Sequence, residues 1–524
     1  MSAAEVLPTP DRDTSGIAGH PRGLMTLFFT EMWERFSYYG MRAFLVLFMV
    51  APVASGGLGF EDARAGVIYG TYTAMVYMLS VPGGWIADRF LGQQNAVLYG
   101  GTLIMFGHIS LAFPMTATFY LGLSLVALGT GLLKPNISSI VGQMYNEGDA
   151  RRDSGFTIFY MGINLGAFLA PIICGTFLAQ SQTFKDWLTS SGIDPRSAWH
   201  FAFGAAAVGM FFGLVQYVIG RKNLKNAGKY PTPAKDATEA NRNRLILGAV
   251  LLVFIAVPVI VGSLAVSGNI ELTPEKLSSV TDILLPVTAL AVLGGLLFFG
   301  AKNKEERARL IVVVILFFAA AVFWGCFEQA GSTLTLFAER NTERQFLGFT
   351  LQSTSFQALN AIFVVALAPV FAALWIYLAK RKKEPATLVK FGLGMVGVGL
   401  GFLVLVPAAK FALGGYLVGA QWLIALYLIH TCGELCLSPV GLSAMTKLAP
   451  TRLVGLIMGV WFLAASMGNY MAGRAVKLTT TMQMDHFFLL MTGIPVAMGI
   501  LLFILAKPVE RMLARSHEES VGGH

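Results

Sequence analysis

The sequence is poor in charged residues, and this shortage argues against a soluble protein. Only 13% of its 524 residues are charged, whereas about 25% is usual for a soluble domain. Hydrophobic residues make up 55% of the chain and recur in long runs. Runs of that length are typical of membrane-spanning helices. We therefore interpret the chain as an all-α, multi-pass membrane protein.

Cysteine is also scarce, and its four positions argue against a disulfide framework. Cys174, Cys326, Cys432 and Cys436 all lie in apolar segments. The last two are four residues apart, a spacing that places two ligands on one helical face, but we favour small packing residues, and no metal is predicted. The residues from Met1 to His20 are polar, so no signal peptide is expected.

The basic residues are spread through short loops, which argues against a nucleic-acid partner despite a net charge of +9. If the N-terminus is cytoplasmic, about 26 of the 38 lysines and arginines fall in cytoplasmic loops and tails, and about 8 in the opposite loops. Positive charge gathers on the cytoplasmic side of membrane proteins. The bias predicts that both termini are cytoplasmic.

About fourteen apolar segments have the length of a membrane span. Their approximate ranges are 23–51, 65–87, 95–113, 118–141, 154–179, 199–219, 245–266, 280–300, 309–337, 350–379, 387–406, 416–446, 453–475 and 486–506. The stretch from Arg221 to Arg244 is basic and lacks apolar periodicity, so we interpret it as a linker. Without the two spans that follow it, six spans precede the linker and six come after.

A weak internal echo favours two related halves. Trp85-Ile86-Ala87-Asp88-Arg89 ends the second span, and Trp375-Ile376-Tyr377-Leu378-Ala379-Lys380-Arg381 ends its counterpart. The first of these, with Gly84 before it and Gly92 after, resembles the signature loop of the major facilitator superfamily, whose transporters are built from six plus six helices. We predict an N-terminal six-helix bundle over 1–220, a linker with two inserted helices over 221–306, and a C-terminal six-helix bundle over 307–524.

Four charged residues interrupt the first span, at Glu31, Glu34, Arg35 and Arg42. On a helix, positions 31, 35, 38 and 42 share one face. A charge at the centre of a membrane helix costs about 2.5–3.5 kcal/mol on the insertion scale. The face is therefore expected to point into protein or a water-filled cavity, which indicates a proton or solute pathway.

Other spans contribute further interior polar groups. Lys134, Glu328 and Glu434 join the four charges of the first span, which makes four acids and three bases. Such near-balance is expected where charges pair across a shared cavity, and an acid left without a partner could carry a proton. Snorkelling to the interface is the alternative for Lys134. The mid-span amides Asn164 and Asn360 suit a zwitterionic ligand or, equally, a hydrogen bond between helices.

Three motifs resemble the signatures of the proton-coupled oligopeptide transporter family, which is part of the major facilitator superfamily. They are Glu31-x-x-Glu34-Arg35-Phe36-x-Tyr38-Tyr39-Gly40, Phe159-Tyr160-x-x-Ile163-Asn164-x-Gly166 and Gly433-Glu434-Leu435-x-x-Ser438-Pro439-x-Gly441-Leu442. The two extra spans between the halves resemble the bacterial members. The resemblance implies proton-driven symport of di- and tripeptides by alternating access, in the inner (plasma) membrane of a bacterium.

The resemblance also implies roles for individual residues. Proton coupling would involve Glu31, Glu34, Arg35 and Lys134. The peptide carboxylate would be held by Arg35, Tyr39 and Lys134, and the peptide amine by Asn164, Asn360 and Glu434. Side-chain pockets would be lined by Tyr38, Tyr77, Trp324, Ser438 and Trp461. Gating salt bridges would join Arg42 to Glu328 and Lys134 to Glu434. No cofactor is implied beyond the proton as coupling ion.

One departure and two alternatives bear on this interpretation. Ala361 follows Asn360 where family members often have proline, which weakens that assignment. A relative that carries another solute, such as nitrate or a peptide-like drug, is one alternative, although the presence of Glu31 and Glu34 disfavours nitrate. An intramembrane enzyme is the other, and the spans hold no Ser–His, paired Asp or metal-ligand constellation with suitable spacing.

Overall fold

The computed structural model describes residues 13–146, 149, 151–234, 236–248, 274–346 and 348–521. Within these residues the chain is almost entirely helical. The first group of helices comprises α1 (Arg22–Val50), α2 (Asp62–Met78), α3 (Ser80–Ile86), α4 (Gln93–Leu111), α5 (Thr116–Gln143), α6 (Arg152–Ala170), α7 (Gln182–Ser190) and α8 (Ala198–Gly220). Residues 237–248 are also helical.

The second group begins after the inserted helix α10 (Pro274–Phe299). It comprises α11 (Lys304–Phe327), α12 (Thr333–Arg340), α13 (Phe356–Lys380), α14 (Thr387–Leu413), α15 (Gln421–Leu448), α16 (Val454–Ala475) and α17 (Met484–Val521). Four two-residue strands form two small sheets: β1 (Thr342–Glu343) pairs parallel with β4 (Val418–Gly419), and β2 (Gln345–Phe346) pairs antiparallel with β3 (Phe349–Thr350).

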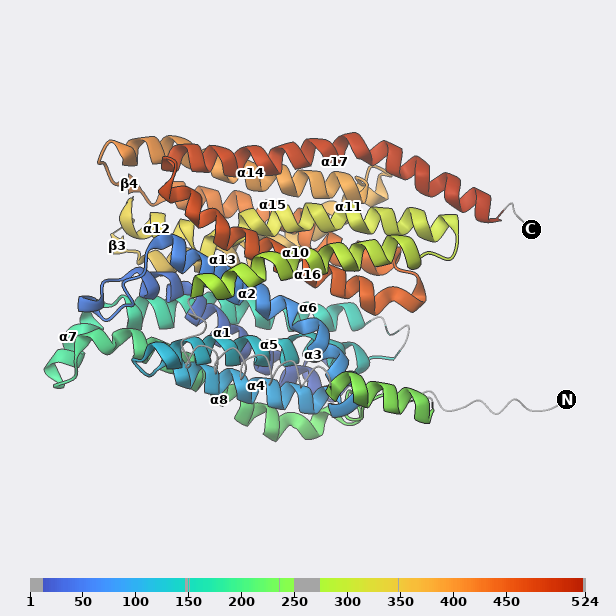
Figure 1. Cartoon of the computed structure of the whole chain (residues 1–524), viewed down its shortest axis with the longest axis horizontal. Coiled ribbons are helices and arrows are strands. Elements are labelled where there is room, and N and C mark those ends of the chain that lie inside the picture. The colour runs from blue at the N-terminus through green and yellow to red at the C-terminus, as the bar shows by residue number, and fades with distance from the viewer. Residues whose placement is uncertain are drawn as a thin grey trace.

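The long helices run side by side along the longest axis of the molecule (Figure 1). Ten helices among the described residues are long and apolar enough to cross a membrane. The all-α membrane fold predicted from the sequence is thereby confirmed. The predicted span 245–266 lies almost wholly outside the described residues, whereas 280–300 corresponds to α10, which contacts α2, α11 and α16.

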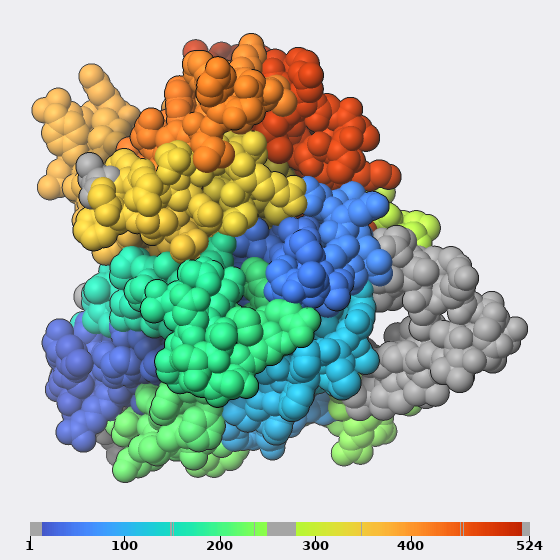
Figure 2. Space-filling view, turned by 90° about the vertical axis from the view of Figure 1, so that its left-hand side faces the viewer, coloured from blue at the N-terminus to red at the C-terminus, as the bar shows by residue number. Residues whose placement is uncertain are grey.

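Hydrophobic packing divides the molecule along the same line as the two groups of helices. One core cluster is made by residues from 285 to 509 together with Ala74. Two others are made by residues from 24 to 224 together with Leu336. Figure 2, viewed from the end that holds α7, shows the later part of the chain in yellow to red above the earlier part in blue to green, with the two in contact.

Different elements of the chain lie at the two ends of the molecule. The α7 end holds α7, β3 and β4 (Figure 1). The opposite end holds the start of the described chain, where Asp13 forms an ion pair of 3.0 Å with Lys225 and Arg151 donates to the carbonyl of Gly19 at 2.6 Å. The last turns of α17 lie there as well.

The segment 309–337, predicted as one span, is broken near its end. The helix stops at Phe327, a 3₁₀ turn spans Glu328–Gly331, and Ser332 has non-helical angles of φ −131° and ψ −95° before α12 begins. A side chain at Gly331 would collide with the hydroxyl of Tyr69. The break is a tertiary effect, because α2 occupies the space that a regular helix with side chains would need.

Candidate functional site

Three buried charges lie within one turn of α1, as the motif predicted. No proline or glycine interrupts the helix between Leu24 and Tyr39, so the charged positions keep a regular helical spacing. Arg35 Nε lies 3.1 Å from Glu31 Oε1 and also pairs with Glu34 Oε2. The side chains of Glu31, Arg35 and Glu34 are 4%, 4% and 0% exposed. The single guanidinium group of Arg35 therefore pairs with two carboxylates, and all three groups are shielded from solvent.

The same cluster retains hydrogen-bonding capacity that no described side chain uses. Glu31 Oε2, Glu34 Oε1 and Arg35 Nη2 are buried and have no hydrogen-bond partner within the described residues. Buried polar groups are usually paired, because an unpaired one costs about 1–3 kcal/mol. A cluster with spare donors and acceptors can accept a proton or a ligand carboxylate without first breaking the whole network.

Lys134 lies on α5 beside this cluster. Its ammonium stands 3.7 Å from the centre of the Tyr77 ring and is within electrostatic reach of Glu31, Glu34 and Arg35. Pro135 follows it inside the helix, so one helical hydrogen bond is missing there. Lys134 is half-buried rather than fully exposed to the interface, which favours a cavity-facing side chain over snorkelling.

Arg42 and Glu328 form a buried ion pair across the two groups of helices. Arg42 Nη2 contacts Glu328 Oε2, and Arg42 Nε donates to the hydroxyl of Tyr69 at 2.7 Å. The side chains of Arg42 and Glu328 are 7% and 5% exposed. The pair joins α1 to the end of α11, at positions 286 residues apart in the chain.

Glu434 and Asn360 meet within the second group of helices. Asn360 Nδ2, on α13, donates to Glu434 Oε2 at 2.9 Å and to Thr431 Oγ1 at 3.1 Å. Ala361, at the position where proline is frequent, is buried within α13 and does not prevent this contact. The carboxylate of Glu434 keeps a second oxygen for a ligand amine.

The other predicted pocket residues are distributed over both groups of helices. Asn164, on α6, donates to the carbonyl of Tyr160 in its own helix at 3.0 Å. Trp324 is half-buried on α11, and its Nε1 has no acceptor within the described residues. Trp461 is buried on α16 and packs against Gly441 of α15. The aromatic pair of α1, Tyr38 and Tyr39, and the hydroxyl residue Ser438 of α15 complete the set, Tyr38 buried and the other two half-buried.

The two groups of helices are joined by polar contacts at the α7 end. Thr176 Oγ1, in the π-type turn η4 (Pro171–Ala179), lies 2.7 Å from Ser355 Oγ, in the 3₁₀ turn η8 (Ser353–Ser355). Arg340 holds Asp62 with both terminal nitrogens, at 2.5 and 2.8 Å. Together with the buried Arg42–Glu328 pair, these contacts close this end.

The second predicted gating pair, Lys134 with Glu434, is not formed. Lys134 and Glu434 form no ion pair within 4.0 Å, since Lys134 faces Tyr77 and Glu434 holds Asn360. Both side chains are half-buried, as is Ser438, and Pro439 beyond it is exposed. The structure therefore brings together one of the two expected gate pairs, Arg42 with Glu328, and not the other.

The comparisons identify the family. The sequence pattern of the POT family matches residues 94–492. The chain belongs to the POT family. Among its relatives, the peptide transporter YePEPT of Yersinia enterocolitica is 38% identical over 94% of this chain and 96% of its own. A di-/tripeptide transporter of Lactococcus lactis is 37% identical over 94% and 97%. An uncharacterized transporter of Bacillus subtilis, YclF, is 42% identical over 95% and 96%.

Solved structures of POT family transporters share the fold. A peptide transporter in complex with alafosfalin has a TM-score of 0.84 at 42% identity, covering 95% of this chain and 97% of its own. A POT family transporter in complex with 5-aminolevulinic acid has a TM-score of 0.85 at 32% identity, covering 95% and 98%. These likenesses confirm the predicted major facilitator fold and place the chain among transporters rather than enzymes.

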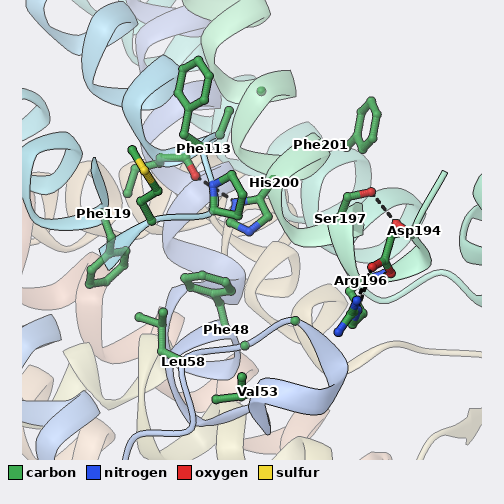
Figure 3. A pocket seen from close by; sticks show the side chains of 17 residues that line it. Phe48, Val53, Leu58, Phe113, Phe119, Asp194, Arg196, Ser197, His200 and Phe201 are labelled. Carbon is green, nitrogen blue, oxygen red and sulfur yellow. Dashed lines mark hydrogen bonds and ion pairs between the residues drawn. The ribbon is translucent and has the colours of Figure 1, made fainter. Parts of the chain in front are cut away.

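A cavity at the α7 end is separate from the central site formed by the buried charges and their partners. Figure 3 shows this space of about 760 Å³ between Phe48, Phe113 and His200. Asp194 binds Arg196 at its rim, at 2.7 Å. The residues that line it all come from the first group of helices and include none of the predicted site residues. The central site is instead built by side chains from both groups.

Two residues of the central site were not predicted from the sequence. Tyr69 and Thr431 hydrogen-bond Arg42 and Asn360 but were not predicted. Tyr69 lies eight residues before Tyr77, a spacing that would have put both on one helical face. Arg474 reaches Asp282 of α10 at 3.0 Å and Thr71 of α2 at 3.0 Å, because neighbouring helices supply partners that the sequence does not reveal.

Proposed function

We propose that this protein is a proton-coupled symporter that carries di- and tripeptides across a bacterial plasma membrane by alternating access. The observation that supports this proposal most directly is how the buried charges are distributed over the two groups of helices. The cations Arg35 and Lys134 belong to the first group of helices and the acid Glu434 to the second. A short peptide is a zwitterion, and this polarity matches its carboxylate and its amine.

The roles assigned to the remaining residues follow the same polarity. Tyr39 lies within reach of the charges of both Arg35 and Glu434, which supports a shared cavity. We assign the peptide carboxylate to Arg35, Lys134 and Tyr39, and the amine to Glu434, Asn360 and Asn164. The side-chain pockets are assigned to the residues Tyr38, Tyr77, Trp324, Ser438 and Trp461.

Proton coupling is assigned to the α1 cluster with Lys134. Glu31 and Glu34 share one guanidinium, so protonation of either releases part of the hold on Arg35. A released Arg35 can bind the peptide carboxylate. Proton entry and substrate entry are then linked through one side chain, and the proton is the only coupling ion that the mechanism requires.

The membrane orientation is proposed from charge. The loops at the α7 end hold few cations, whereas the opposite end holds the basic segment from Arg221 to Arg244 and the basic turns at both ends of the second group. The positive-inside rule assigns the opposite end, and with it both termini, to the cytoplasm. The end joined by the Arg42–Glu328 pair is then the outer one, and we propose that bundles over 1–220 and 307–524 move around an insert over 221–306.

The test is uptake of labelled dialanine by proteoliposomes under an inward proton gradient. We expect accumulation that a protonophore abolishes and that unlabelled di- and tripeptides compete for. Free alanine, which lacks the distance between amine and carboxylate that the two ends of the cavity require, serves as the matched control competitor. Accumulation without competition by peptides, or competition by nitrate instead, would replace the substrate assignment.

A further inference from the structure

A groove of about 590 Å³ separates the first turns of α11 from the last turns of α17, at the end opposite α7. The two helices contact each other along their length. The lining positions are 304, 307, 308 and 311 on α11, and 508, 511, 512 and 515 on α17. Both sets follow the spacing i, i+3, i+4, i+7, which defines one helical face. Two matched faces are therefore turned towards the same space.

The lining is cationic at the mouth and apolar at the base. The cations are Lys304, Arg307, Arg511 and Arg515, and the apolar residues are Ala308, Ile311, Pro508 and Met512. Because α11 runs from this end into the membrane and α17 runs out of it, Ile311 and Pro508 lie deepest. A charged rim above an apolar base is the polarity of a phospholipid, whose headgroup lies above its acyl chains.

Two neighbouring acids are held by cations that do not line the groove. Glu305 pairs with Arg309, and Glu306 is held by both terminal nitrogens of Arg452 at 2.7 Å. Glu510 is exposed on α17, two positions after Pro508 and so on another face of the helix. Among the described residues, Arg307, Arg511 and Arg515 have no ion pair.

We propose that this groove binds the phosphate of an anionic phospholipid, whose acyl chain packs on the apolar base. Two observations carry the assignment: the charge complementarity between the lining cations and a phosphate, and the exposure of Ile311 and Pro508 at the apolar base. Arginine binds phosphate through paired N–H groups, so the site favours a phosphate over other anions. The site is independent of the peptide cavity.

The experiment uses the purified full-length protein in detergent. Binding of dioleoyl-phosphatidylglycerol and of dioleoyl-phosphatidylcholine is measured by native mass spectrometry, and inorganic phosphate is titrated as competitor. We expect the double variant Arg307→Gln/Arg511→Gln to bind phosphatidylglycerol at least about tenfold more weakly. The matched control Lys380→Gln/Lys383→Gln removes two exposed cations elsewhere at this end and should leave binding unchanged.

A second variant, Arg307→Lys/Arg511→Lys, keeps the charge but not the paired N–H groups and should bind phosphatidylglycerol more tightly than the glutamine variant, which separates loss of charge from loss of fold. Equal affinity for the two lipids, or an unchanged affinity in the glutamine variant, would overturn the proposal. Displacement of phosphatidylglycerol by inorganic phosphate at the same concentration as the lipid would assign the site to a soluble phosphate compound and overturn the lipid assignment.

Discussion

At the residue scale, the site depends on four acids that are held by three different partners. Glu34 shares Arg35 with Glu31, Glu328 pairs with Arg42, and Glu434 accepts from the neutral amide of Asn360. A carboxylate held by a cation is stabilised as an anion, whereas one held only by an amide keeps its charge available for a ligand. The proposed roles in coupling, gating and amine binding therefore fall to acids with three different partners.

The substitution Glu434→Ala should nearly abolish peptide uptake while the protein still inserts. It removes the charge proposed to face the peptide amine and leaves the amide of Asn360 with Thr431 but without its charged acceptor, a loss of about 1.5–3 kcal/mol for a hydrogen bond to a charged group. Peptide affinity, measured by binding to purified protein, is expected to fall more than about tenfold. The control is Cys432→Ala, two residues away on α15. Affinity within about twofold of the unaltered protein would contradict the amine assignment.

The substitution Glu34→Gln should separate exchange from accumulation. Glutamine imitates a permanently protonated carboxyl group, so Arg35 loses its pairing with position 34, keeps that with Glu31, and no proton is gained or lost at position 34. We expect counterflow of labelled peptide to persist and accumulation driven by a pH step to disappear in the same proteoliposomes. Glu61→Gln, at an exposed acid outside α1, is the control. Retained accumulation would move the coupling role to Glu31.

At the element scale, close contacts between helices set how the two groups meet. α2 lies against α16 with little between them, because Gly70 and Gly473 bring the backbones together. A Cβ atom at Gly70 would lie 2.6 Å from the Cα of Gly473 and 2.9 Å from the carbonyl of Asn469. Ser466 also donates to the carbonyl of Ala74 across this contact, at 2.8 Å. This contact between α2 and α16, which we call the seam, has no room for a larger side chain at Gly70.

The substitution Gly70→Ala should therefore force α2 and α16 apart. Overpacking of this kind costs about 1–3 kcal/mol, so the thermal midpoint of the purified protein is expected to fall. Gly294→Ala on α10 is the matched control, since nothing lies within 4 Å of its added Cβ. There alanine should be neutral or stabilising by up to about 1 kcal/mol, because it has the higher helix propensity. Equal midpoints for both variants would show that the seam is not tight.

At the scale of the whole molecule, the structure shows one side of a transport cycle. The α7 end is joined by the buried Arg42–Glu328 pair and by the exposed Arg340–Asp62 pair, whereas Lys134 and Glu434 are apart. Alternating access requires these contacts to exchange: the pairs at the α7 end must break while others form at the opposite end. The equilibrium between the two states is set by the contacts that only one of them makes.

The substitution Arg42→Ala should shift the molecule towards opening at the α7 end. It leaves Glu328 buried and unpaired, which costs about 3–5 kcal/mol in the closed state. A Ser438→Cys reporter, in a background with the half-buried Cys432 replaced by alanine, should react faster with a membrane-impermeant thiol reagent added from the outside. Arg340→Ala removes an exposed pair at the same end, worth about 0–1 kcal/mol, and should change labelling little. Equal labelling in both variants would rule out the buried pair as the gate.

The sequence by itself determined the membrane class, the family and the identity of the interior charges. Those conclusions rest on composition and on local motifs, and the buried cluster of Glu31, Glu34 and Arg35 is local too, because all three share one turn of α1. The cost of placing a charge in lipid already requires such residues to face inwards. Most span boundaries follow from the same rule, since a span ends where apolar residues end.

Only the tertiary structure decided which charges meet. Arg42 and Glu328 are 286 positions apart, and their pairing depends on how α1 and α11 pack. The break at Ser332, the contact of Tyr69 with Arg42 and the bridge from Arg474 to Asp282 likewise arise from neighbouring helices. The separation of Lys134 from Glu434 belongs to one conformation of the cavity, and a single sequence that must serve several conformations cannot specify which of them is seen.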